Sequence, residues 1–344
     1  MFLEKEGKLI YSYDGETVCI EAWGKDALRV RATKNRSFTG RDWALEAKDA
    51  HAGEVEIFED PSAKGGAFAN MYEGTDTSYG KITNGKLHAV IDSGSVITFY
   101  HEDGRVLLKE HFRRLRDEES MPLNIMGREY SNGVGDNFRI VARFVARKGE
   151  KIFGMGQYQQ HELDLKGCML ELAQRNSQVS VPFYLSSIGY GFLWNNPGVG
   201  QVMFANNGTE WVTESGKEID YLVIAGDTPA EIEENYMTLT GKPPMMPEYG
   251  MGFWQCKLRY QTQEELLEGA REYKRRGLPI SVIVADYFHW PHQGDWKFDK
   301  DYWTDLKAMV DELEGMGIKL MVSIWPTVEE GSENFKEMEE LGYL

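Results

Sequence analysis

The sequence is poor in cysteine, in basic charge and in long apolar runs, and each shortage excludes a class of protein. Its three cysteines, Cys19, Cys168 and Cys256, lie too far apart for a zinc motif or a secreted disulfide framework, so we expect buried, reduced thiols. Only 38 Lys and Arg stand against 55 Asp and Glu, a net charge of −17. Such a surface disfavours nucleic acid and anionic membranes as partners. No run of 18 apolar residues is present, which excludes a membrane-spanning helix.

Targeting and cofactor signals are equally scarce. The N-terminus is charged from Glu4 onward and has no apolar stretch of the signal-peptide type, which favours a cytoplasmic location. Gly154-Met-Gly156 and Gly250-Met-Gly252 both have Gln where a dinucleotide fingerprint needs its third glycine. No cofactor is therefore expected. The composition leaves the oligomeric state open, a homo-oligomer included.

The first two thirds of the chain have the pattern of an antiparallel β-protein. Apolar residues alternate with polar ones over 138–146, 18–22 and 28–32, as in half-buried strands. Asn84-Gly85 and Asp103-Gly104 each separate two such runs and favour hairpin turns. Many short strands with turns at this spacing predict a β-sandwich.

After the sandwich the pattern changes to alternating strands and helices. Thr228-Pro-Ala-Glu231 predicts a capped helix that ends at Gly241, and we place the domain boundary between residues 244 and 245. A strand over 249–256 is followed by a helix capped by Thr262, and apolar runs at 280–285 and 319–325 predict two buried parallel strands. We expect Ser332 to cap a last helix. The order βαβαβα predicts a parallel sheet in residues 245–344.

This second region is too short for a complete barrel. A (β/α)₈ barrel needs roughly 250 residues, so a barrel would have only three of its eight strands here. A small doubly wound sheet is the other architecture with this pattern. The absence of a phosphate-binding glycine turn and the aromatic or acidic residues at each strand end favour the barrel. Because a part-barrel leaves strand edges unpaired, we expect the chain to be truncated.

The chemistry-bearing residues gather where the parallel strands end, which is where β/α folds place their sites. Five of the nine tryptophans lie in this short stretch: Trp254, Trp290, Trp296, Trp303 and Trp325. Aromatic planes pack on the C–H faces of sugar rings, although each Trp singly could equally fill the core. Asp286 ends an all-apolar strand, where an ionised carboxylate is costly unless it is paired or faces an open pocket.

Three interpretations of Asp286 follow from its position. It can accept hydrogen bonds from two sugar hydroxyls, which we favour, or it can cap a helix or pair with Lys257 or Arg259. It could also join His289 and His292 at a metal. Pro291 prevents the helical spacing that such a site would need, so a role at the rim of a pocket is favoured and no metal is expected.

Several ordered motifs resemble glycoside hydrolase family 31, the α-glucosidase and α-xylosidase family. Those of the sandwich and the junction are Phe153-Gly-Met-Gly-Gln157, Leu163-Asp-Leu-Lys-Gly167 and Leu239-Thr-Gly-Lys-Pro243. Those of the strands that follow are Met251-Gly-Phe-Trp-Gln-Cys-Lys-Leu-Arg-Tyr260, residues 275–286 and Ile324-Trp-Pro326. The resemblance covers nearly the whole chain and is strongest after residue 151. It implies a galactose-mutarotase-like β-sandwich followed by the first three β/α units of a (β/α)₈ TIM barrel.

The resemblance further implies a retaining α-glycosidase that works from the end of an oligosaccharide or α-glycoside through two Asp carboxylates. Those carboxylates lie on later barrel strands in the family, so no catalytic residue is assigned in this chain. The resemblance places part of the sugar subsite at the following residues: Asp286, Tyr260, Tyr287, Trp325, Trp290 and Asn176. Several family members have Asp at the position of Asn176, which removes a charge here.

Two functions of other kinds compete with this hypothesis. A carbohydrate-binding protein without catalysis, or an inactive fragment, would use the same aromatic residues and Asp286. Another β/α-barrel enzyme with a β-sandwich domain is a third possibility. Neither the sugar, glucose, xylose or galactose, nor the linkage follows from the sequence.

Overall fold

A computed structural model describes residues 1–46, 49–60, 77–111, 113–115 and 123–344. The chain divides into two compact units, unit 1 over Met1–Pro243 and unit 2 over Pro244–Leu344. The sequence-based boundary after residue 244 differs from this division by one residue. None of the described helices is long and apolar enough to cross a membrane.

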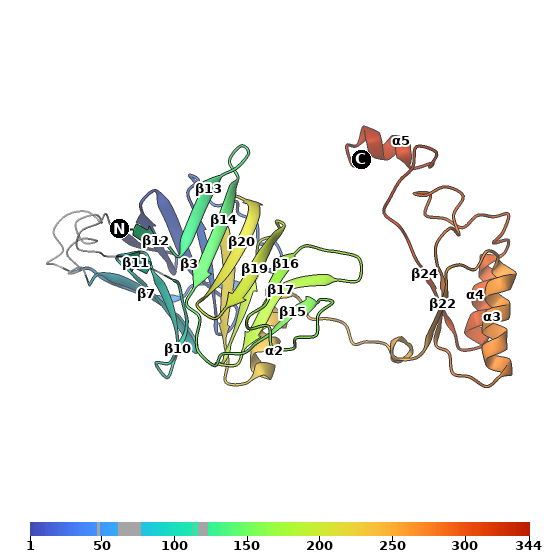
Figure 1. Cartoon of the computed structure of the whole chain (residues 1–344), viewed down its shortest axis with the longest axis horizontal. Coiled ribbons are helices and arrows are strands. Elements are labelled where there is room, and N and C mark those ends of the chain that lie inside the picture. Colours follow the sequence, from blue (N-terminus) through green and yellow to red (C-terminus); the bar gives the residue numbers. More distant parts are fainter. Residues whose placement is uncertain (47–48, 61–76, 112, 116–122) are drawn as a thin grey trace. The chain divides into compact units, whose positions relative to one another are not determined.

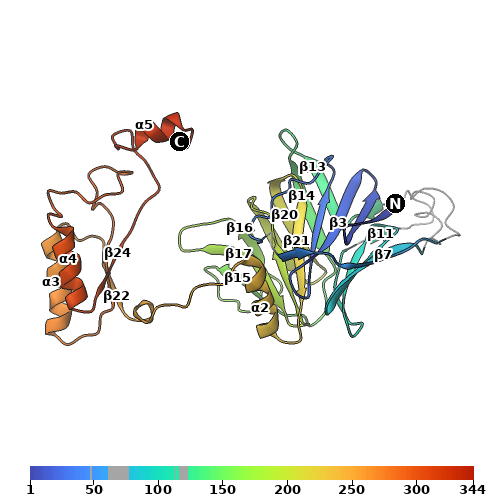
Figure 2. The same ribbon diagram turned by 180° about the vertical axis from the view of Figure 1, so that it is seen from behind.

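Unit 1 is built from antiparallel sheets, as the alternating pattern predicted. The largest sheet has the order β1-β2-β3-β4-β21-β18-β17-β15, with β5 paired to β3. Its strands are β1 (Phe2–Lys5), β2 (Lys8–Tyr13), β3 (Glu16–Trp23), β4 (Ala27–Thr33), β5 (Ala50–His51), β15 (Ile152–Gln157), β17 (Val179–Ser186), β18 (Tyr190–Trp194) and β21 (Ile219–Ala225). Figure 2 brings β21 and β3 of this sheet to the front.

Two five-stranded sheets complete the sandwich. The first has the order β10-β9-β8-β7-β6, and the second β13-β14-β20-β19-β16, which lies in front in Figure 1. Their strands are β6 (Glu54–Phe58), β7 (Tyr79–Asn84), β8 (Leu87–Asp92), β9 (Ile97–His101), β10 (Val106–Lys109), β13 (Arg128–Asn132), β14 (Phe138–Phe144), β16 (Met169–Leu172), β19 (Gly200–Ala205) and β20 (Gly208–Gly216). A separate pair joins β11 (Arg113–Leu115) and β12 (Leu123–Ile125).

The core of unit 1 lies between the large sheet and the two smaller ones. Each sheet contributes fully buried side chains, such as Ile20, Phe99 and Trp211. The other face of the large sheet is covered by α2 (Pro229–Thr240), whose Tyr236 ring stacks on Phe183 at 3.8 Å. Thr228 caps this helix as predicted, because its side chain accepts a hydrogen bond from the Glu231 backbone N–H.

The glycines of the 153–157 motif form a bulge between β15 and β17. Three successive residues have positive φ, Gly154 at 115°, Met155 at 70° and Gly156 at 93°, and the register shifts there. The bulge turns the Met155 side chain fully into the core. The two glycines of this motif therefore allow the bulged backbone path of β15.

We expect Gly156→Ala to destabilise unit 1 by at least about 2 kcal/mol. A Cβ at this position would lie 2.2 Å from the Val179 carbonyl oxygen, in addition to the cost of its positive φ. Gly149→Ala is the matched control, since Gly149 also has positive φ, 82°, but no atom within 4 Å of a Cβ. Urea denaturation of both variants measures the difference. Equal losses of stability would show that the contact with β17 is unimportant.

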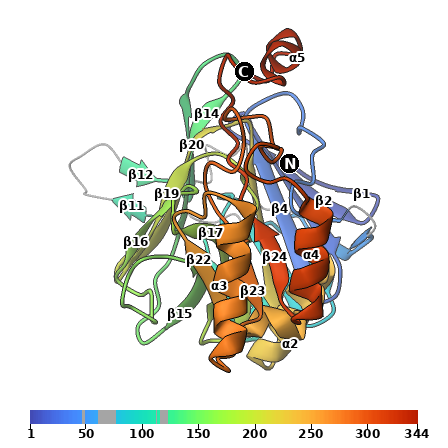
Figure 3. The same ribbon diagram turned by 90° about the vertical axis from the view of Figure 1, so that its right-hand side faces the viewer.

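Unit 2 is a small three-stranded parallel sheet with helices on one face. The order is β22-β23-β24, and Figure 3 shows α3 and α4 in front of the strands. The elements are η2 (Glu248–Met251), β22 (Trp254–Lys257), α3 (Gln263–Arg275), β23 (Val282–Ala285), α4 (Leu306–Gly315), β24 (Lys319–Val322) and α5 (Phe335–Glu340). Thr262 caps α3 as predicted, by accepting from the Glu265 backbone N–H.

Three local predictions in unit 2 were wrong. The run over 319–325 was expected to be a buried strand, but β24 spans only Lys319–Val322 and its residues are exposed or half-buried. The strand expected over 249–256 is a 3₁₀ turn followed by β22, because only Trp254–Lys257 pairs with β23. Ser332 does not cap the last helix. Its hydroxyl accepts from the Asn334 backbone N–H, and the helix begins at Phe335 without a side-chain cap.

Candidate functional site

The parallel register of unit 2 places two short polar side chains, Asp286 and Ser323, at one edge of the sheet. Ala285 of β23 pairs with Lys257 of β22 and with Val322 of β24. Asp286 and Ser323 each follow these paired positions directly, so they leave the sheet side by side. Because carboxyl ends of parallel strands meet at one edge, this is where a β/α fold places a binding site.

Asp286 is held by two neighbours and keeps acceptor capacity for a ligand. The Ser323 hydroxyl donates to Oδ1 at 2.6 Å, and the Cys256 thiol lies 3.6 Å from Oδ2. The same Ser323 oxygen accepts from the Tyr287 backbone N–H at 3.2 Å. The carboxylate is half-buried. An ionised carboxylate accepts more hydrogen bonds than these two, so ligand hydroxyls can still bind it.

The ion-pair alternative for Asp286 is wrong. Among the described residues no Lys, Arg or His nitrogen lies within 4 Å of its oxygens. Lys257 pairs instead with Glu265, and the Arg259 guanidinium donates to the Phe288 carbonyl oxygen at 3.3 Å. Both cations are therefore engaged elsewhere, and the carboxylate at the strand end is open to a neutral ligand.

Cys256 was expected to be a buried thiol, and the structure corrects this. Its side chain is exposed at the end of β22, whereas Cys19 is buried and Cys168 is half-buried. Partial desolvation of the sulfur and the negative charge of Asp286 raise the pKa of the Cys256 thiol, so it stays protonated and donates to the carboxylate. Sequence reasoning missed this contact, although the parallel register of β22 and β23 is the signal that could have found it.

An aromatic wall lies beside the carboxylate. The Tyr287 ring lies 4.8 Å from that of Trp325 and 6.2 Å from that of Trp290. Trp325 is 43% exposed, whereas Trp290 is 5% exposed and supports the wall from inside. The Trp296 indole N–H donates to the Trp325 carbonyl oxygen at 3.0 Å, which fixes the loop after β24. The arrangement offers an open apolar face within reach of a polar group.

Backbone strain accompanies this wall. Tyr287 and Phe288 have φ of 45° and 54°, in the left-handed region that bulky residues avoid. Such conformations cost on the order of 1 kcal/mol each and concentrate at functional sites. The turn they make leaves Phe288 exposed and buries His289 behind it.

The structure places Tyr260 in the core rather than on an open pocket wall. It is 5% exposed and belongs to the cluster under α3, and its hydroxyl accepts from the Gln255 amide at 3.3 Å. Burial raises the pKa of this hydroxyl. A ring in this position can shape the site from beneath but has little surface to offer a ligand.

Two further residues considered in the sequence analysis are Asn176, which belongs to unit 1, and His289, which was considered as a metal ligand. Asn176 lies exposed on the loop between β16 and β17 of unit 1, beside the Arg175–Glu171 ion pair, and its role stays a prediction. His289 is 2% exposed, and burial lowers its pKa. Within the described ranges, no group of three or more His, Cys, Asp or Glu could hold a metal ion.

Comparisons with known proteins bear on both units. Residues 17–202 match the glycosyl hydrolase 31 N-terminal galactose mutarotase-like domain, and residues 243–344 match the glycosyl hydrolases family 31 TIM-barrel domain. The predicted fold, a β-sandwich followed by β/α units of a partial barrel, is thereby confirmed.

Individual proteins with similar sequences or structures come from the same family. An uncharacterized family 31 glucosidase of Pseudescherichia vulneris is 44% identical over 99% of this chain and 63% of its own length. An α-xylosidase of Saccharolobus solfataricus is 37% identical over 60% of this chain and 30% of its own length. The crystal structure of a family 31 α-xylosidase from a soil metagenome, complexed with xylose, is 49% identical, with a TM-score of 0.88 over all of this chain and 50% of that one.

The chain thus spans 30% to 63% of the length of these relatives. The match to the mutarotase-like domain alone covers more than half of the chain, and the match to the TIM-barrel domain follows it in the sequence. The chain belongs to glycoside hydrolase family 31, of which it holds the mutarotase-like domain and part of the TIM-barrel domain.

Proposed function

We propose that the protein is part of a retaining α-glycosidase that removes a terminal α-xylosyl residue from an oligosaccharide or α-glycoside. The observation that carries this proposal is the Asp286 carboxylate, oriented by Ser323 and Cys256 and free of any cation among the described residues. A carboxylate with spare acceptor capacity beside an exposed aromatic face matches the two surfaces of a sugar ring, its hydroxyls and its C–H face.

In this proposal the residues of the strand-end site have different roles. Asp286 accepts hydrogen bonds from two neighbouring hydroxyls of the terminal sugar, and Trp325 packs on the ring. In a retaining mechanism, one carboxylate forms a covalent glycosyl-enzyme and a second acts as acid and then base, about 5–5.5 Å away. We assign neither role to a residue of this chain. Asp286 binds and positions the sugar in this proposal.

Xylose is favoured over glucose by the names of the relatives. The 37% identical relative and the 49% identical structure are α-xylosidases, and that structure contains xylose. Glucose is the second candidate, because the 44% identical relative is named a glucosidase. The two sugars differ by one hydroxymethyl group, and a difference of that size is worth roughly 10–200-fold in kcat/KM.

The test compares aryl α-glycosides as substrates of the complete gene product. We expect hydrolysis of the α-xyloside with a kcat/KM at least ~10-fold above that of the α-glucoside, and none of the α-galactoside. Residues 1–344 alone should be inactive, because no nucleophile is assigned among them. Preference for the α-glucoside would favour the second candidate, and sugar binding without turnover of any glycoside would favour a non-catalytic binding protein.

A further inference from the structure

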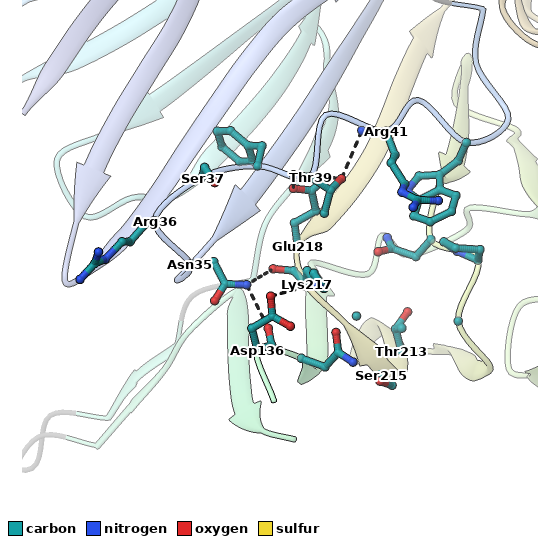
Figure 4. Close-up of a pocket in the computed structure, with 17 residues that line it drawn as sticks. Asn35, Arg36, Ser37, Thr39, Arg41, Asp136, Thr213, Ser215, Lys217 and Glu218 are labelled. Carbon is teal, nitrogen blue, oxygen red and sulfur yellow. Dashed lines mark hydrogen bonds and ion pairs between the residues drawn. The ribbon is translucent and has the colours of Figure 1, made fainter. Parts of the chain in front are cut away.

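Unit 1 carries a large hollow whose lining includes none of the residues proposed to bind the terminal sugar. Its volume is about 880 Å³, within the range of sites for small ligands, and all of its lining residues belong to the sandwich. Figure 4 shows the loop after β4 along one side and the hairpin between β20 and β21 along the other. The tip between β13 and β14 and the loop after β18 complete the lining.

The loop over this hollow is rigidly attached to the hairpin. Both carboxylate oxygens of Glu218 are held by Thr39, one by its backbone N–H and one by its hydroxyl, each at 2.8 Å. The Asn35 amide donates to carbonyl oxygens of Asp136 and Lys217 (Figure 4). Buried Arg29 fixes the far end of the loop through the Arg41 carbonyl oxygen at 2.9 Å. The hollow is therefore preformed, which lowers the ordering cost of binding.

Several polar side chains of the lining have unused hydrogen-bonding capacity. Within the part of the chain that the structure describes, five of them make no side-chain hydrogen bond: Arg36, Ser37, Arg41, Asn137 and Ser215. The lining also contains an aromatic platform, because Trp43 is 46% exposed and its ring lies 5.3 Å from the Arg41 guanidinium. Trp43 has a φ of 54°, a strained conformation for a bulky residue.

The mixture of charges selects the class of ligand. The lining holds the carboxylates of Asp136 and Glu218 and the cations of Arg36, Arg41 and Lys217. Asp136 pairs with Lys217 at 2.8 Å and Glu218 is held by Thr39, so the groups left for a ligand are the two guanidiniums and the neutral side chains of Asn137 and Ser215. A hydroxyl both donates and accepts, so a neutral polyhydroxylated ligand can accept from the guanidiniums and also exchange hydrogen bonds with the amide and the serine hydroxyl. The exposed Trp43 face suits the C–H face of a sugar ring.

We propose that this hollow is a second carbohydrate site, which binds a neutral oligosaccharide on the sandwich independently of the strand-end site in unit 2. Trp43 provides the stacking surface, and Arg41 and Asn137 donate hydrogen bonds to sugar hydroxyls. The proposal does not rest on catalysis, so a protein that hydrolyses no glycoside could still bind sugar here.

Calorimetric titration with xylotriose and maltotriose tests this second site. The titrated protein is the Asp286→Asn variant, in which binding at the strand-end site of unit 2 is weakened. We expect at least one trisaccharide to bind this variant with a Kd on the order of a millimolar. Adding Trp43→Gly should weaken that binding about tenfold or more, because the aromatic surface is lost. Glycine tolerates the positive φ at this position, so the substitution relieves strain and should not unfold the sandwich.

Phe58→Ala is the matched control, because Phe58 is 44% exposed on the same unit but outside the hollow. It should leave the Kd unchanged, and thermal melts verify that both variants are folded. The proposal is overturned if neither trisaccharide binds, if Trp43→Gly binds as tightly as its parent, or if glucuronate or sulfate binds while the neutral trisaccharides do not.

Discussion

Asp286→Asn should lower the kcat/KM of the complete protein for its preferred α-glycoside by roughly 10²–10⁴-fold. The carboxylate has room for hydrogen bonds from two sugar hydroxyls, because among the described residues only the Ser323 hydroxyl and the Cys256 thiol donate to it. Each hydrogen bond to a charged group is worth about 1.5–3 kcal/mol. The amide keeps the shape of the side chain, so the loss reports charge and acceptor capacity. Initial rates at varied substrate concentration measure it.

Two further variants separate binding from positioning. Ser323→Ala removes one hydrogen bond to the carboxylate but not the carboxylate itself, so a smaller loss of about tenfold is expected. Asp301→Asn removes an exposed carboxylate elsewhere in unit 2 and should leave kcat/KM within about twofold of the wild type. If Asp286→Asn kept the wild-type rate while folding normally, Asp286 would not be a sugar ligand.

The sequence predicted features that are determined locally. Thr228 and Thr262 cap their helices because the cap hydrogen bond spans only three residues. The hairpin expected at Asn84-Gly85 forms between β7 and β8, although Asn84 still pairs with Leu87 and the two turn residues are Gly85 and Lys86. The strand expected over 249–256 was wrong because pairing with β23, a tertiary property, begins only at Trp254. Ser332 has the residue type of a cap, but the chain around it bends before the helix starts.

The candidate site was predictable in position but not in its contacts. An ionisable residue that ends an apolar strand identifies Asp286, since the cost of burying its charge does not depend on the rest of the fold. Its contacts with Ser323 and Cys256 need the order and register of three strands. Tyr260 is buried although the resemblance suggested a lining position, because residue type and spacing do not say which side of a loop a ring takes. The hollow in unit 1 is assembled from segments too distant in sequence for any motif to reveal.

The same limit applies to the buried charges of the sandwich, which come from strands far apart in the sequence. Arg128 on β13 is 8% exposed and pairs with Glu16, 112 residues away, at 2.9 Å, and with Glu110. Its guanidinium also donates to the Ser95 carbonyl oxygen at 2.8 Å. Burial raises the pKa of Glu110, with a smaller contribution from the nearby Glu16 carboxylate, and the Arg128 guanidinium opposes this shift. The arginine therefore compensates two carboxylates that the core cannot otherwise hold.

Arg128→Met should consequently destabilise the sandwich by about 3–5 kcal/mol, because it leaves the carboxylates of Glu16 and Glu110 buried without a counter-ion. Urea denaturation of the intact protein measures the loss. Arg139→Met is the matched control on the neighbouring strand β14: its ion pair with Glu214 is 43% and 55% exposed and should contribute less than about 1 kcal/mol. Adding Glu110→Gln to Arg128→Met should recover part of the stability, since it removes one unpaired charge. The charge argument would be contradicted if the two arginine variants lost the same free energy of unfolding, or if Glu110→Gln restored none of it. In that case packing of the Arg128 stem, and not its charge, would stabilise this part of the sandwich.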